Sequence, residues 1–123
     1  MSPIHLAIRA SNPSRSLEFY QALGFVKKTE VLLEKFASKL IFLEYKNSGL
    51  ELELVHNYQN SKPIPPESGF LHIGLEVDNL EQFLEKLSAL GINPSAPPST
   101  TPDGMKICFL TDPDGYQIEL IGK

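Results

Sequence analysis

The chain has 123 residues, of which 41% are hydrophobic and 21% charged, as in a soluble globular domain that buries a core without disulfides. Its formal net charge of −4 argues against a nucleic-acid surface and against a polybasic membrane patch. Because it shows no membrane-span run, no signal peptide and a single cysteine, Cys108, we expect a cytoplasmic protein without an intrachain disulfide.

The first part of the chain predicts one strand, one helix and three further strands. Residues 3–9 alternate as a strand does, and Ser11-Asn12-Pro13 is typical of a helix start. Apolar residues then recur at helical spacing as far as Gly24, which is expected to end the helix. The three segments that follow are β-branched, aromatic or alternating, namely residues 25–33, 39–45 and 50–56. The predicted order over residues 1–57 is βαβββ.

A second unit with the same order follows a linker. Residues 58–69 are rich in proline and polar residues and show no apolar period, so we interpret them as the linker. Residues 70–123 then predict a strand, a helix capped by Asp78 or Asn79 and ended by Gly91, and two final strands. Four prolines in residues 93–104 predict a short edge strand or a loop there. The fold class is therefore α+β, with two βαβββ modules in a single domain.

The two modules repeat a pattern that carries chemistry. His5 and His72 lie in similar apolar runs at an offset of 72 − 5 = 67 residues, and Leu52-Glu53-Leu54 recurs as Ile118-Glu119-Leu120 at 119 − 53 = 66. Each module thus supplies one imidazole and one carboxylate. Two of each can surround one divalent ion such as nickel, cobalt, zinc, iron or manganese, and leave positions for water or substrate. The pattern predicts a metal enzyme.

Strand alternation restricts which side chains share the face of this predicted metal site. Glu51 and Glu53 lie on one face and the intervening leucines on the other, so alternation cannot choose between them; only the match to Glu119 favours Glu53. Arg9 shares the parity of His5, and Asn57 that of Glu53. His56 has the opposite parity and receives no ligand role. The alternative is that both histidines belong to the core and both glutamates to a solvated sheet face.

The same residues resemble a known family. The beginning of the chain resembles the opening of vicinal oxygen chelate proteins, with His5 before a helix whose end reads Phe19-Tyr20-x-Ala22-Leu23-Gly24-Phe25. The runs around His72 and around Asp112-Pro113-Asp114-Gly115 resemble glyoxalase I, the lactoylglutathione lyase family of that superfamily. The resemblance covers essentially the whole chain. It implies the glyoxalase/bleomycin-resistance/dihydroxybiphenyl dioxygenase-like fold, with two βαβββ modules forming a curled sheet around a metal site.

Carried over residue by residue, the resemblance implies a metal set of His5, Glu53, His72 and Glu119. Family contacts to glutathione would fall on Arg9 and Asn57, and a guanidinium can hold a carboxylate through two hydrogen bonds. Other relatives place a basic residue in the loop before the penultimate strand, and in this chain only Lys106 is near enough to that position to serve as a substrate contact. The elbow before Gly24 is one residue shorter than in many glyoxalases, and Ser68 stands where some relatives have arginine.

The implied reaction converts the methylglyoxal–glutathione hemithioacetal to S-lactoylglutathione, a carbon–sulfur lyase activity that detoxifies methylglyoxal. Glu119 is expected to be the main base and Glu53 its partner, although the order of the two stays open, as does any contribution of Glu51. Glyoxalases of the short bacterial type with histidine as first ligand tend to use nickel or cobalt, so the resemblance implies Ni²⁺, with Co²⁺, Zn²⁺ and Mn²⁺ as alternatives. A homodimer that shares each site between subunits is implied, with no nucleic acid or membrane partner.

Other members of the superfamily are the alternatives to a glyoxalase. A coenzyme A thioester epimerase shares the chemistry, but its relatives usually have glutamine where this chain has Glu53. An extradiol dioxygenase or a thiol transferase acting on an antibiotic would use two histidines and one carboxylate. An antibiotic-binding resistance protein would lack the metal set.

Overall fold

The computed structural model describes residues 6–46, 48–59, 72–101 and 104–122, in two compact units that divide between residues 64 and 65. The division lies within the predicted linker, most of which is outside the described residues, as are His5 and the beginnings of the strands predicted from residues 3 and 70. We call residues 1–64 the N-terminal unit and residues 65–123 the C-terminal unit, and each is described by itself.

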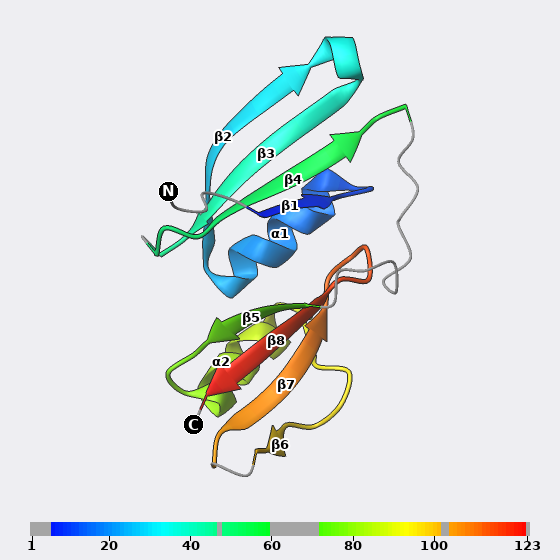
Figure 1. Cartoon of the computed structure of the whole chain (residues 1–123). Helices are drawn as coiled ribbons and strands as arrows, with labels where there is room; N and C mark the ends of the chain where they lie inside the picture. The colour runs from blue at the N-terminus through cyan, green and yellow to red at the C-terminus, as the bar shows by residue number, and fades with distance from the viewer. Residues whose placement is uncertain (1–5, 47, 60–71, 102–103, 123) are drawn as a thin grey trace. The chain divides into compact units, whose positions relative to one another are not determined.

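The N-terminal unit is a mixed four-stranded sheet with one long helix against one face (Figure 1). Its strands lie in the order β1-β4-β3-β2, with β1 parallel to β4 and the other pairs antiparallel. A short 3-10 helix, η1, joins β2 to β3 and was not predicted. The elements are β1 Leu6–Arg9, α1 Pro13–Leu23, β2 Phe25–Leu33, η1 Glu34–Phe36, β3 Ser38–Tyr45 and β4 Glu51–Asn57.

Helix α1 begins and ends where local chemistry requires. The side-chain oxygen of Asn12 accepts a hydrogen bond from the backbone N–H of Arg15 at 3.2 Å, and Pro13 occupies the first turn, where its missing N–H costs nothing. Gly24 ends the helix at φ 112°, a left-handed conformation that favours glycine. Apolar side chains of the helix and of alternate strand positions are buried together, including Tyr20, Leu23, Leu43, Leu52 and Leu54. One sheet face therefore forms the core of this unit.

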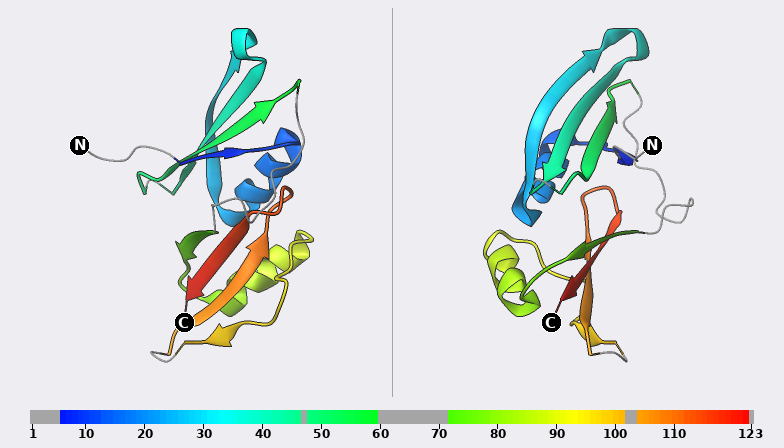
Figure 2. Two further views of the ribbon diagram at one scale, coloured as in Figure 1. Left: turned by 45° about the vertical axis from the view of Figure 1, so that its right-hand side comes forward. Right: turned by 60° about the vertical axis from the view of Figure 1, so that its left-hand side comes forward.

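The C-terminal unit repeats this arrangement (Figure 2). Its strands lie in the order β5-β8-β7-β6, again with the first and last long strands parallel. The elements are β5 His72–Glu76, α2 Leu80–Ala89, β6 Ser99–Thr100, β7 Lys106–Thr111 and β8 Gln117–Gly122. Strand β6 has two residues and lies at the edge of the sheet, as the prolines around it predict. Both units therefore confirm the predicted βαβββ fold.

Helix α2 packs on one face of its sheet, and the segment that leads from β5 into it passes close to the backbone of β8. Leu80, Leu87, Leu110, Ile118 and Leu120 are fully buried. A Cβ on Gly122 would lie 2.8 Å from the carbonyl oxygen of Val77, so only glycine fits at that position. The opposite face carries Glu53 in the N-terminal unit, and His72 and Glu119 in the C-terminal unit. Within the described residues, no helix is both long and apolar enough to cross a membrane.

Candidate metal centre

Strands β5 and β8 bring one imidazole and one carboxylate together in the C-terminal unit. Nε2 of His72 lies 3.8 Å from Oε1 of Glu119, which is too far for a hydrogen bond. Two donors on one ion, each with a metal bond of about 2.1 Å, lie at most about 4.2 Å apart. The separation is therefore within the reach of a single divalent ion. The side chain of His72 is 39% exposed and that of Glu119 only 18%, so the imidazole is the more accessible of the two.

Two neighbours shape the surroundings of this pair. Gly74 is the register partner of Glu119, and a Cβ added there would lie in ordinary van der Waals contact with Oε1, at 3.6 Å. Phe109 is the antiparallel partner of Glu119 and packs edge-on against His72, with ring centroids 5.5 Å apart. The sequence analysis did not single out Phe109. The ring restricts the orientation of the imidazole.

The N-terminal unit places Glu53 in the equivalent surroundings. Its partner across the parallel pair is Ala7, as Gly74 is for Glu119. Its partner across the antiparallel pair is Phe42, as Phe109 is for Glu119. A small residue and a phenylalanine therefore flank each predicted glutamate ligand. The repeat extends beyond the sequence pattern to the strand register, while His5 lies outside the described residues.

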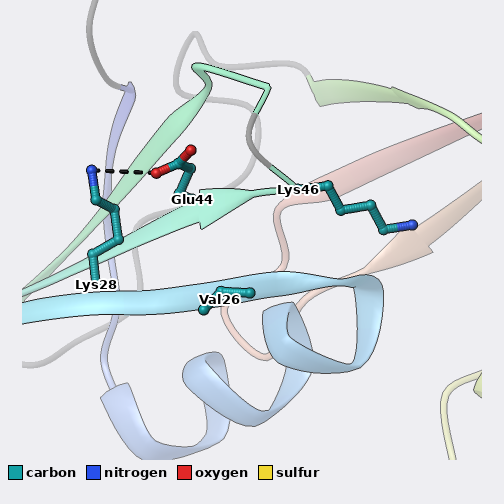
Figure 3. A pocket seen from close by; sticks show the side chains of 4 residues that line it. All are labelled: Val26, Lys28, Glu44 and Lys46. Atoms are coloured by element: carbon teal, nitrogen blue, oxygen red, sulfur yellow. Dashed lines mark ion pairs between the residues drawn. The ribbon is translucent and has the colours of Figure 1, made fainter.

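Glu51 shares the open face with Glu53 but is bound in an ion pair. Nζ of Lys28 lies 3.1 Å from Oε2 of Glu51 and 3.3 Å from Oε2 of Glu44. The hydrogen bonds to Glu51 and then to Glu44 raise the pKa of Lys28. Figure 3 shows Lys28 and Glu44 reaching toward each other beside a shallow hollow that Val26 and Lys46 also line. No sequence pattern indicated this network.

The remaining polar residues of the N-terminal unit lie at the end of β4. Arg9 is the parallel partner of Val55, and Asn57 follows Val55 by two residues, so Arg9 and Asn57 share the face of Glu53. The side-chain oxygen of Asn57 lies 3.2 Å from the hydroxyl of Ser38, which donates to it. His56 lies on the other face, where Nδ1 is 2.9 Å from the carbonyl oxygen of Ala10. Its interaction is with the backbone between β1 and α1.

Lys106 lies on the face opposite to the predicted site. It is the first residue of β7 and has the same parity as the buried Cys108 and Leu110, whereas Phe109 has the parity of the open face. Its Nζ pairs with Oε1 of Glu81 on α2 at 3.2 Å. The strand pleat thus turns Lys106 toward the helix, and a contact with substrate requires it to leave Glu81. Its substrate role stays a prediction.

The chemistry of the described donors fits a borderline divalent ion. Imidazole nitrogen and carboxylate oxygen are the ligands that nickel, cobalt, zinc and manganese accept in proteins. Among the described residues, no cluster of three or more His, Cys, Asp or Glu side chains is close enough to hold a metal. The pair in the C-terminal unit is therefore half of the predicted set of four, which also draws on the N-terminal unit.

Comparison with known proteins bears on this site. The sequence profile of the Glyoxalase/Bleomycin resistance protein/Dioxygenase superfamily matches residues 2–120. The lactoylglutathione lyase of Haemophilus influenzae is 31% identical over 125 residues, which cover 98% of this chain and 92% of that protein. A probable chloroplastic lactoylglutathione lyase of Arabidopsis thaliana is 30% identical over 122 residues. That alignment covers 96% of this chain but only 35% of the plant protein, so the chain spans about a third of its length.

A solved structure supports the same grouping. The glyoxalase I of Leishmania major, described as trypanothione-dependent, superposes with a TM-score of 0.83 at 26% sequence identity. The superposition covers 99% of this chain and 86% of that one. The shared architecture thus extends over nearly the whole of both chains.

Proposed function

Since the chain belongs to the Glyoxalase/Bleomycin resistance protein/Dioxygenase superfamily, we propose that it is a metal-dependent lactoylglutathione lyase. Its reaction is the isomerisation of the hemithioacetal of methylglyoxal and glutathione to S-lactoylglutathione, in the cytoplasm. Relatives with this name that match nearly end to end support the proposal, among them the Haemophilus influenzae protein. The proposed role is detoxification of methylglyoxal.

One observation carries the proposal. Glu53 and Glu119 have equivalent strand partners in their own sheets, each with a small residue on one side and a phenylalanine on the other. His72 lies beside Glu119. A coenzyme A thioester epimerase is disfavoured because its relatives usually have glutamine at the position of Glu53. A three-ligand enzyme, such as a thiol transferase, would not need this second carboxylate, and an antibiotic-binding protein would need neither.

The four predicted ligands, His5, Glu53, His72 and Glu119, would hold the ion. When bound, a divalent metal acts as a Lewis acid that stabilises negative charge developing on the substrate oxygens. Glu119 accepts the proton from the carbon that bears sulfur and returns it to the neighbouring carbon, with Glu53 as its opposite partner. Phe109, which packs edge-on against His72, restricts the orientation of the imidazole.

The polar end of β4 provides the proposed contacts with the thiol carrier. Arg9 can bind a carboxylate of glutathione through two hydrogen bonds, and the amide of Asn57 can bind a peptide group. Lys106 is the third proposed contact and must first leave Glu81. Trypanothione, on which the Leishmania major enzyme depends, is the competing carrier.

The metal and the assembly complete the proposal. Ni²⁺ is the proposed ion because histidine occupies the first ligand position, with Co²⁺, Zn²⁺ and Mn²⁺ as the alternatives. Two chains pair as a homodimer, and each of two equivalent sites takes ligands from both subunits.

Substitution of the C-terminal pair tests the proposed roles. We expect Glu119→Gln to lower kcat by at least about 100-fold, because general base catalysis contributes roughly that much. Glu76→Gln is the matched control, since Glu76 lies on β5 with the same parity as His72 and is exposed. The readout is thioester formation from methylglyoxal and glutathione, followed by ultraviolet absorbance. Equal losses in both variants, or none in Glu119→Gln, would contradict the assignment.

A further inference from the structure

Strand β4 presents two carboxylates on the same face of the sheet. Glu51 and Glu53 are half-buried while Leu52 and Leu54, between and beyond them, are fully buried. Residues two apart on a strand lie about 7 Å apart, a distance that flexible glutamate side chains can largely close. Both carboxylates can therefore approach an ion bound at this face. A site that uses one of them must restrain the other.

Lys28 is placed to restrain Glu51. The β2–β3 register shifts between Lys27 and Thr29, so Lys28 occupies an irregularity in the strand. From there its ammonium contacts the carboxylates of Glu51 and Glu44, at 3.1 and 3.3 Å. Glu44 and Glu51 are themselves register partners, and Figure 3 shows the Lys28–Glu44 part of this network. One lysine thus binds two carboxylates that would otherwise repel each other.

In the C-terminal unit, the residue that corresponds to Glu51 is neutral. The residue two positions before Glu119 is Gln117, whose partner in the register is Thr111. The amide of Gln117 donates a hydrogen bond to the hydroxyl of Thr111 at 3.0 Å. At the corresponding position, one unit has a neutral amide tied to its neighbour and the other a carboxylate tied to a lysine. In both units, the side chain two positions before the predicted glutamate ligand is held by a partner on a neighbouring strand.

We propose that Lys28 is a positioning residue that holds Glu51 away from the metal, so that Glu53 alone of the two supplies a ligand. The inference rests on the proposed function, and it answers which glutamate of β4 serves the site. Exposed ion pairs contribute little to folding stability, and the side chain of Lys28 is 46% exposed, so its removal leaves the fold intact.

The test uses the full-length protein stripped of metal and loaded with Co²⁺, whose visible absorption reports the ligands around the ion. We expect Lys28→Met to change this spectrum and to lower kcat by about 10-fold, a typical effect of losing a residue that orients a ligand. The double variant Lys28→Met/Glu51→Gln restores both, because no second carboxylate remains to compete. Lys28→Arg keeps the cation and retains both signals.

The matched control is Lys27→Met, which removes the neighbouring lysine from its pair with Glu30 and leaves the contacts of Glu51 in place. An unchanged spectrum in Lys28→Met, or a double variant as impaired as the single one, would overturn the proposal. Loss of the bound ion in Glu51→Gln would make Glu51 a ligand and overturn it too. Glu53→Gln separates the two proposals, because retention of the normal spectrum there refutes the ligand set itself.

Discussion

Burial lowers the reactivity of the single cysteine, Cys108. Its side chain lies on the core face of β7, the residue is 4% exposed, and burial raises the pKa of its thiol. The thiolate is the form that reacts, so the folded protein should label slowly with a thiol reagent. Comparing labelling rates in buffer and in denaturant checks this. Equal rates would show that the thiol is accessible in the folded state.

The two candidate caps of helix α2 can be distinguished at the same scale. The sequence could not choose between Asp78 and Asn79 as the N-cap of α2. In the structure, the side-chain oxygen of Asn79 accepts a hydrogen bond from the backbone N–H of Gln82 at 3.0 Å. We expect Asn79→Ala to lower the free energy of unfolding by about 1 kcal/mol. Asp78→Ala is the matched control and should change it much less. Urea denaturation measures both, and the reverse order would assign the cap to Asp78.

Among the elements, the turn between β7 and β8 depends on one buried carboxylate. Oδ1 of Asp112 accepts from the backbone N–H groups of Asp114 and Tyr116 at 2.8 and 2.9 Å. Asp112 is 4% exposed, so its loss leaves two donors unsatisfied in the interior. This turn directs β8, and with it Glu119, back along the sheet.

We therefore expect Asp112→Ala to lower the free energy of unfolding by about 2–4 kcal/mol, at about 1–2 kcal/mol for each lost acceptor contact. Asp112→Asn keeps an oxygen acceptor and should lose less. Equilibrium denaturation in urea measures the difference. A neutral effect of Asp112→Ala would show that the backbone hydrogen bonds from Asp112 to Tyr116 and from Gly115 to Asp112 hold the turn without the carboxylate.

The sequence predicts the elements because their signals are local. Asn12 and Gly24 delimit α1, and the alternation of leucines with Glu51 and Glu53 assigns the two faces of β4. The contacts of Lys28 could not be predicted, because a bulge in the register leaves no recognisable pattern and the lysine meets Glu51 across 23 residues. The pairing of Lys106 with Glu81, 25 residues away in the sequence, could not be predicted either.

Short-range signals also missed the short helix η1. Residues Glu34–Phe36 form a single 3-10 turn whose end is set by Ala37 in a left-handed conformation, at φ 49°. Alanine gives no indication of such a bend, because glycine and asparagine are the residues that usually adopt it. Phe109 was missed for another reason, since its contact with His72 depends on the pairing of three strands.

At the scale of the whole molecule, the proposed homodimer makes a prediction about mixed subunits. Glu53→Gln disables the N-terminal unit and Glu119→Gln the C-terminal unit, so each variant alone should be inactive. If each site joins units from different subunits, a mixed dimer contains one intact site and one with both changes. Unfolding and refolding equal amounts together should then recover about a quarter of the normal activity. A mixture as inactive as its parts would place both units of a site in one chain.

The most direct measurement of the central claim is the rate of S-lactoylglutathione formation by metal-stripped protein before and after Ni²⁺ is returned. We predict negligible activity without metal, recovery with Ni²⁺ and smaller recovery with Zn²⁺, and no recovery in Glu119→Gln. Activity that is unaffected by metal removal, or none with any of Ni²⁺, Co²⁺, Zn²⁺ and Mn²⁺ although the protein binds the ion, would contradict the proposed lyase.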